Sequence, residues 1–299
     1  MADASDIAIS TGALWTRRFR RILGWVAFGL VLVAVFTALT FPYDALNTRV
    51  IKELARQSGA SVQVDVRRPY RPLGVEWLGV RLSRGDQPGM TIARATGVLS
   101  WIDALQGIPV VKLSLWTDER AANPAATATA IFTDWTFQRM AEVQGMAERV
   151  DLPGTAGHPI KGGRGNATFR FVGGGHSTHP LDGELRLEVN DLAVAQITTQ
   201  GIRVPEWSLN SLRVTVQCSQ QVCRIGEFKG NGPDGVLEAT GQLMIGLTPQ
   251  ETRWDVAVTL TCSQALSQRA SAVGGFPLPV GTPLRAKLVG PLWQPRVAL

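Results

Sequence analysis

The sequence predicts a mainly β protein: an N-terminal single transmembrane helix followed by a curled antiparallel β-sheet, shaped as a half-barrel, groove or sandwich, with a few short helices. Three observations predict this fold class. The stretch from Ile22 to Phe41 is apolar and contains no charged residue. Many segments after it alternate apolar and polar residues, as half-buried strands do. The 31 glycines and 17 prolines supply frequent turns between these segments.

Residues 17–42 are predicted to be a membrane anchor. At about 1.5 Å per residue, the apolar stretch spans about 30 Å, the hydrocarbon thickness of a bilayer. Basic residues precede it and indicate the cytoplasmic side, so residues 1–16 form a disordered cytoplasmic tail and residues 43–299 lie outside. A cleaved signal peptide is the alternative, but Phe36-Thr37-Ala38 is a poor cleavage site. The residues expected to hold the anchor at its interfaces are Arg17, Arg18, Arg20, Arg21, Trp25, Phe41 and Tyr43.

The charge of the chain is mildly basic, with 30 Lys and Arg against 24 Asp and Glu, a formal net charge of +6. No cluster of basic residues interleaved with aromatics follows the anchor, apart from the pair Arg67-Arg68. Nucleic acid is therefore not an expected partner. Arg67, Arg68 and Arg71 are candidates for contact with lipid head groups or a protein partner, and a solvated loop is the alternative.

The first β-rich half is predicted over residues 43–160. It opens with an amphipathic helix from Ala45 to Ser58, whose apolar residues form one stripe. A short helical link follows from Trp101 to Gly107, and a second short helix is predicted from Asp134 to Glu148, with Asp134 as its N-cap. The predicted strands are Ser61–Arg67, Val75–Ser83, Met90–Ser100, Pro109–Thr117 and Ala122–Phe132.

The second half, residues 161–299, alternates more cleanly, and the Gly-rich stretch from Leu152 to Gly165 is the expected boundary between the halves. A short helix is predicted within Ser263–Ala272. Antiparallel strands with one apolar face need cover, so the sheet is expected to curl, to pack a second sheet or to hold an apolar ligand such as lipid. The alternating segments are Ala167–Phe171, Glu184–Val189, Leu212–Gln217, Leu237–Ile245, Trp254–Thr261 and Leu284–Leu288.

The three cysteines predict one disulfide and one free thiol. Cys218 ends one strand and Cys223 opens the next, so a hairpin places them opposite each other at its mouth. The compartment outside the anchor is oxidising if the protein belongs to a bacterial envelope, and a Cys218–Cys223 bridge is expected there. Cys262 has the apolar parity of its strand and is expected to be a buried thiol.

No catalytic, cofactor-binding or metal-ligating residues are predicted. His176 and His179 share a Gly-rich loop, but no carboxylate cluster completes a metal site, and a solvated loop is the favoured interpretation. The stretch from Gly162 to Asn166 lacks the Gly-Lys-Ser/Thr ending of a phosphate-binding loop and precedes a strand. No nucleophile-elbow or zinc-protease motif occurs, so an enzyme is not expected and no cofactor is implied.

The order of elements resembles the type II secretion system protein N family. The residues that carry this resemblance are the Phe-Pro-Tyr-Asp sequence from Phe41 to Asp44, the stretch Pro72–Val80, similar to an early strand pair, the close pair Cys218 and Cys223 before the Gly-rich segment Gly230–Gly246, and the closing run Pro283–Pro295. The resemblance covers most of residues 17–299 and is weakest from Ala121 to Gly165. The chain is more remotely similar to AsmA-like envelope proteins, whose curled sheets form grooves for lipid.

The resemblance implies a single-pass protein of the bacterial inner membrane with its N-terminus in the cytoplasm and its C-terminal domain in the periplasm. It implies an accessory part of the type II secretion machinery, with other components of that system and inner-membrane lipids as partners. The alternative is an AsmA-like protein that binds or transfers lipid in an apolar groove. A closed and an open apolar sheet face require the same alternation of apolar and polar residues, so the sequence leaves open which of the two is present.

Overall fold

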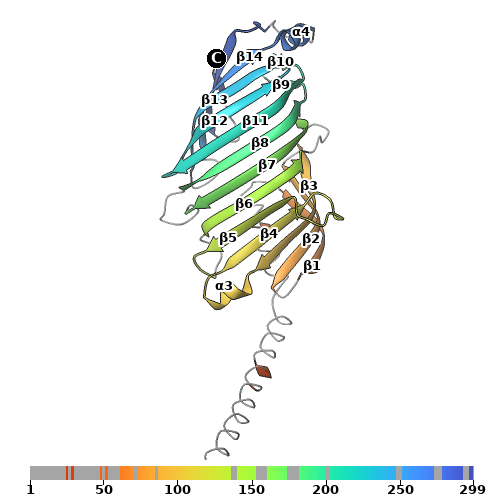
Figure 1. Ribbon diagram of the computed structural model, residues 1–299, viewed down its shortest axis with the longest axis vertical. Helices are drawn as coiled ribbons and strands as arrows, with labels where there is room; N and C mark the ends of the chain where they lie inside the picture. Colours follow the sequence, from red (N-terminus) through yellow and green to blue (C-terminus); the bar gives the residue numbers. More distant parts are fainter. Residues whose placement is uncertain are drawn as a thin grey trace, which may run out of the picture. The chain divides into compact units, whose positions relative to one another are not determined.

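The computed structural model describes residues 61–70, 73–84, 87–135, 140–152, 160–173, 182–199, 202–246, 251–272, 278–291 and 296–298, together with 25, 28–29, 48 and 51–52 before them. The chain divides into two compact units, Met1–Leu46 and Asn47–Leu299. The second unit contains the β-structure (Figure 1). Most of the predicted anchor and of the helix Ala45–Ser58 lies outside the described residues. Thr48, Ile51 and Lys52, which are described, are helical.

The fold is mainly β, as predicted, and is built on one 14-stranded antiparallel sheet. Its strand order follows the chain from β1 to β16, except that β9 and β10 form a separate two-stranded hairpin and β8 pairs directly with β11. Neighbouring strands are rotated in a constant sense, which gives the sheet the twist seen in Figure 1. The described strands form one uncurled sheet, so the predicted curl and the predicted sandwich of two packed sheets are not found among them.

The strands of the first half, except the last, follow the predicted alternation closely. The short helix α3, Trp101–Leu105, joins β3 to β4 at the predicted place. The strands are β1 Ser61–Pro69, β2 Gly74–Arg84, β3 Gln87–Leu99, β4 Val110–Trp116, β5 Ala126–Phe132 and β6 Met140–Asp151.

The helix predicted from Asp134 to Glu148 is wrong. Strand β6 occupies most of this stretch and pairs with β5 and β7. Its small apolar residues Ala141, Val143 and Ala147 alternate with Glu142, Gln144 and Glu148, a period of two that the helical spacing of Phe137, Met140 and Ala141 obscures. Pairing on both sides therefore determines the conformation of this segment.

The second half continues the same sheet. Strand β7 pairs with β6 across the predicted boundary Leu152–Gly165, and both halves belong to one compact unit. The helix α4, Gln264–Ala272, lies within the predicted Ser263–Ala272 and follows β14. The strands are β7 Ile160–Val172, β8 Asp182–Val194, β9 Ile197–Thr199, β10 Ile202–Val204, β11 Trp207–Ser219, β12 Val222–Gly232, β13 Gly235–Met244, β14 Arg253–Cys262, β15 Pro283–Pro291 and β16 Arg296–Ala298.

A compact core lies where β8 ends and β11 begins. The buried side chains of this cluster are Val189, Leu192, Val194, Leu209 and Leu212, with Leu152, Ile160 and Trp207 packed against them. Leu209 and Pro109 are the largest fully buried side chains in the described part of the chain. Much of the remaining apolar surface of the sheet is only half-buried, and this surface is the candidate site.

Candidate functional site

One face of the sheet carries uninterrupted rows of apolar residues, and we call it the apolar face. In the first row each residue lies directly opposite the next, from β2 to β15, and none is polar or charged. With strands about 4.8 Å apart, this row is about 50 Å long. It consists of Val75, Gly97, Leu113, Ala128, Gly145, Phe169, Leu185, Val216, Ile225, Gly241, Val256 and Leu288.

A second row runs parallel to the first and passes through the two cysteines. It is also free of charged residues, so the apolar face is at least two rows wide from β3 to β15. This row consists of Leu99, Val111, Ala130, Val143, Phe171, Gly183, Cys218, Cys223, Leu243, Trp254 and Gly290.

Most large side chains of the two rows are half-buried rather than sealed in a core. Phe169, Leu185 and Val216 are half-buried in the first row, and Phe171, Leu243 and Trp254 in the second. Gly145 provides room for an aromatic ring, because a Cβ there would lie 2.6 Å from the Phe169 ring. Neighbours within the face thus shield one another laterally, while the side facing away from the sheet stays open among the described residues.

The described helices leave this face largely uncovered. Helix α3 has no buried residue. Helix α4 buries Leu266 and Ala270 near the end of β14, beside the buried Cys262 thiol, whose pKa is raised by burial. The free, buried state of Cys262 confirms the prediction made from its parity.

Helix α4 is held by a buried carboxylate in the β12–β13 turn. Asp234 is 4% exposed, and it accepts hydrogen bonds from the Ser208 backbone N–H at 2.6 Å, from the Ser208 hydroxyl and from the Arg269 guanidinium. Burial alone would raise the pKa of Asp234, but the hydrogen bonds from Arg269 and Ser208 outweigh it and hold the pKa below its ordinary value. The charged form of Asp234 therefore fastens α4 to the start of β11.

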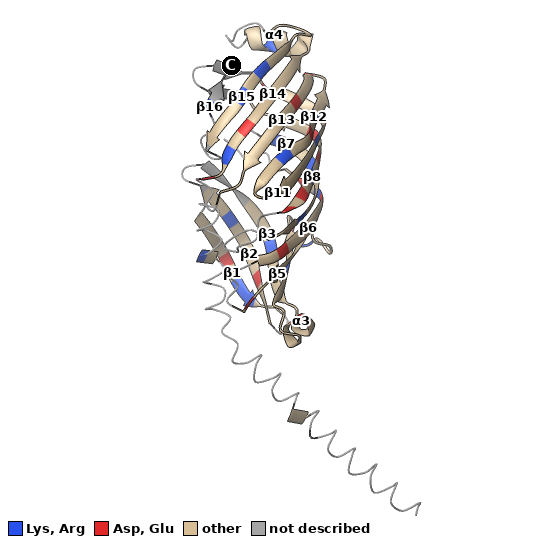
Figure 2. Ribbon diagram, turned by 90° about the vertical axis from the view of Figure 1, so that its left-hand side faces the viewer, with Lys and Arg blue, Asp and Glu red and all other residues tan. Residues whose placement is uncertain are grey.

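The opposite face of the sheet is polar and carries cross-strand ion pairs. Arg213 of β11 lies directly opposite Glu188 of β8, and Lys229 of β12 lies opposite Glu238 of β13. Figure 2 shows basic and acidic residues interspersed over the strands without a large patch of one sign. Exposed pairs of this kind contribute little to the free energy of unfolding. Their charges keep this face in contact with water, so apolar contacts are left to the other face.

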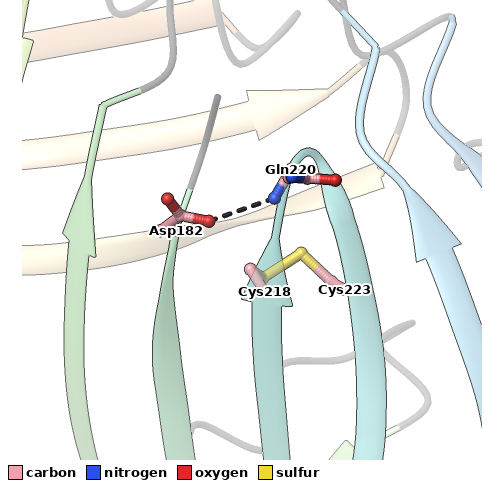
Figure 3. The surroundings of a disulfide bond; sticks show 4 residues. All are labelled: Asp182, Cys218, Gln220 and Cys223. Carbon is pink, nitrogen blue, oxygen red and sulfur yellow. Dashed lines mark hydrogen bonds between the residues drawn. A yellow bond between two sulfur atoms is a disulfide. The ribbon is translucent and has the colours of Figure 1, made fainter. Parts of the chain in front are cut away.

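The predicted disulfide is present between Cys218 and Cys223, which lie opposite each other in β11 and β12 (Figure 3). Their Cα atoms are 3.9 Å apart, closer than the 4.4–6.8 Å usual for disulfides. The turn is Gln220-Gln221, both with positive φ, and Asp182 accepts a hydrogen bond from the Gln220 N–H at 3.0 Å. The bridge and this bond hold the β11–β12 hairpin together where the second row crosses it.

A cavity of about 910 Å³ lies beside this hairpin. Its lining includes Arg170, Asp182, Glu184, Gln220 and Arg224, so it mixes both signs of charge. Arg170 is already paired with Glu142 at 2.7 Å. The cavity therefore offers no concentrated charge for an anionic or cationic ligand.

The other predicted site residues are only partly described. Trp25 is helical and 73% exposed, and its ring meets that of Phe28 edge-on at 6.1 Å. Arg67 and Arg68 are exposed at the end of β1. The remaining predicted residues, Arg17, Arg18, Arg20, Arg21, Phe41, Tyr43 and Arg71, lie outside the described residues, as do His158, His176 and His179.

Within the described part of the chain, no three His, Cys, Asp or Glu residues gather in a metal-ligating group. None of the described helices is both long and apolar enough to cross a bilayer. No protein-family model matches the chain, and no curated protein or solved structure matches it significantly.

Sequence reasoning identified the alternating segments but not the rows that they form. The period-two pattern assigns each residue to a face, whereas the register between strands decides which apolar residues become neighbours. Phe169 and Val216 carry no signal in the sequence that would align them. The order of the strands along the chain was the available indication of which strands become neighbours, since sequential hairpins place consecutive segments side by side.

Proposed function

We propose that this chain is a non-catalytic, membrane-anchored protein of the bacterial envelope whose apolar face binds the acyl chains of lipids. The observation that carries the proposal is the first row, an uncharged strip about 50 Å long whose phenylalanine, leucine and isoleucine side chains are half-buried. Polymethylene chains need no hydrogen-bond partners, so a long apolar strip without polar groups suits them.

The second candidate is an accessory component of the type II secretion system that acts by protein–protein contact. The resemblance of the chain to the protein N family supports it, and so does the edge of the sheet. Strand β15 pairs with β16 only from Lys287 to Val289, which leaves most of its outer edge without a strand among the described residues. An extended segment of a partner could add to that edge. The two candidates share the inner-membrane location with a periplasmic domain.

A deletion strain complemented by matched variants tests the proposal. Val216 lies in the middle of the first row, and its neighbour Gln217 points to the polar face. Val216→Arg places a charge on the apolar face, while Gln217→Arg places the same charge on the solvated face. We expect the deletion strain and the Val216→Arg strain to admit a large antibiotic while secreting proteins normally, and the Gln217→Arg strain to behave as wild type.

The opposite phenotype would contradict lipid binding. Loss of proteins from the culture supernatant with an intact permeability barrier would support the secretion role instead. Immunoblots of the two variants at equal abundance control for folding.

A further inference from the structure

Large apolar side chains are exposed together at one end of the sheet. Trp101 is 60% exposed, Leu105 is 79% exposed, and Ile102 and Ile108 are exposed beside them. Trp135, which follows β5, is exposed as well. We call these five residues the apolar tip.

The backbone assembles the tip from segments that are separate in the sequence. The Leu99 N–H donates to the Leu73 carbonyl at 3.0 Å, which joins the β1–β2 turn to the end of β3. The Ser100 N–H donates to the Val110 carbonyl at 2.8 Å, and the Phe132 N–H donates to the Pro109 carbonyl at 2.9 Å. The β1–β2 turn, helix α3 and the residues after β5 therefore share one end of the sheet.

A hydrogen-bonded turn after α3 holds these side chains in their exposed positions. The Ile108 N–H donates to the Asp103 carbonyl at 2.9 Å, and the Gly107 N–H donates to the Ala104 carbonyl at 3.0 Å. Gly107 has φ +82, a left-handed conformation that suits glycine. Pro109 is fully buried beneath the turn. The fold thus holds Leu105 and Trp101 outward instead of leaving them in a frayed loop.

Basic side chains accompany the tip. Arg67 and Arg68, at the end of β1, are exposed, and within the described residues neither forms an ion pair. The nearby acidic residues Asp103 and Asp134 are half-buried, and Glu76, on β2, is paired with Arg94 at 2.7 Å. The charge that this end of the sheet presents to solvent is therefore chiefly that of the two arginines.

We propose that the apolar tip and Arg67 and Arg68 form a membrane-contact surface that rests on an anionic bilayer. Tryptophan and aliphatic side chains insert at the boundary of head groups and acyl chains, and arginines beside them attract anionic head groups. The predicted anchor keeps the chain at such a bilayer, so docking is an intramolecular event that needs only modest affinity. This contact orients the domain and is independent of what the apolar face binds.

Fluorescence of a labelled full-length chain in nanodiscs tests the proposal. A polarity-sensitive label is attached through Leu105→Cys in a Cys262→Ala background, and the nanodiscs contain phosphatidylethanolamine and phosphatidylglycerol with a lipid-borne quencher. The matched control is Glu119→Cys, an exposed residue in the turn at the other end of β4. We expect the label at Leu105 to be quenched and the label at Glu119 to remain unquenched.

Removal of the two positive charges beside the tip provides a second readout. Arg67→Gln with Arg68→Gln is expected to lower the ratio of docked to undocked label about 30-fold, because each basic side chain near an anionic surface strengthens the attraction about five-fold. Nanodiscs of phosphatidylcholine alone should weaken quenching in wild type to the same degree. Equal quenching at Leu105 and Glu119 in chains that have entered the nanodiscs would overturn the proposal and favour a protein partner for the tip.

Discussion

Replacement of Leu209 by alanine is expected to lower the free energy of unfolding by about 2–5 kcal/mol. Leu209 is 2% exposed in the core cluster and packs against two glycines of β12. A Cβ on Gly230 would lie 2.6 Å from Leu209 Cδ1, and a Cβ on Gly232 would lie 2.6 Å from its Cα. Backbone this close cannot collapse far into the space that alanine leaves, so the cavity persists. Urea unfolding of the detergent-solubilised chain, followed by circular dichroism, measures the loss.

The matched control is Leu185→Ala, a change of the same volume on the apolar face. Leu185 is half-buried, so it loses less contact and its replacement is expected to cost well under half as much. Equal losses for the two variants would mean that the apolar face is as tightly packed as the core cluster. That result would contradict the open face on which the proposed function depends.

Replacement of Asp234 by alanine is expected to cost about 3 kcal/mol of stability at neutral pH. The substitution leaves the part-buried Ser208 N–H and hydroxyl without their acceptor and removes the partner of Arg269. Helix α4 should then detach before the sheet unfolds, because the Arg269–Asp234 ion pair joins this helix to the β12–β13 turn. Hydrogen exchange of α4 amides, compared with those of β11, measures this local opening.

The contribution of Asp234 should also depend on pH. Its pKa is lowered in the folded chain, so its stabilising effect is present above the unfolded value of about 3.9 and is lost as the pH falls through the folded value. The gap in stability between wild type and Asp234→Asn is therefore expected at pH 7 and should close in strong acid. A gap that widens on acidification would contradict this assignment.

Asp255→Asn is the control for both measurements. Asp255 pairs with Lys287 at 2.8 Å on the polar face, and its side chain is 45% exposed. Exposed pairs contribute about 0–1 kcal/mol, so this variant should unfold almost as wild type does. The contrast isolates the effect of burial from that of charge.

The sequence predicted the elements of the fold better than their arrangement. Strict alternation identified strands such as β8 and β14, and the loop-end position of Cys218 and Cys223 identified the disulfide. The strand β6 was missed because small residues such as Ala141 and Gly145 carry a weak pattern in either period. Pairing with β5 and β7 stabilises β6. A short stretch of sequence carries no signal of such tertiary contacts.

The candidate site was predictable only in part. The apolar parity of Phe169, Val216 and Trp254 was visible in the sequence, but their half-burial depends on what packs over them. The same holds for Trp101 and Leu105, where the helical link was predicted and its outward orientation was not. Exposure is a property of the assembled sheet, so a single strand or helix gives little indication of it.

Site-specific photo-crosslinking in living cells tests the central claim most directly. A benzophenone amino acid at Val216 would face the occupant of the apolar face, and the same group at Gln217 would face solvent on the other side of the sheet. Mass spectrometry of the purified adducts is expected to find phospholipid on the Val216 chain and none on the Gln217 chain. Protein adducts at Val216, with no phospholipid, would contradict a lipid-binding face.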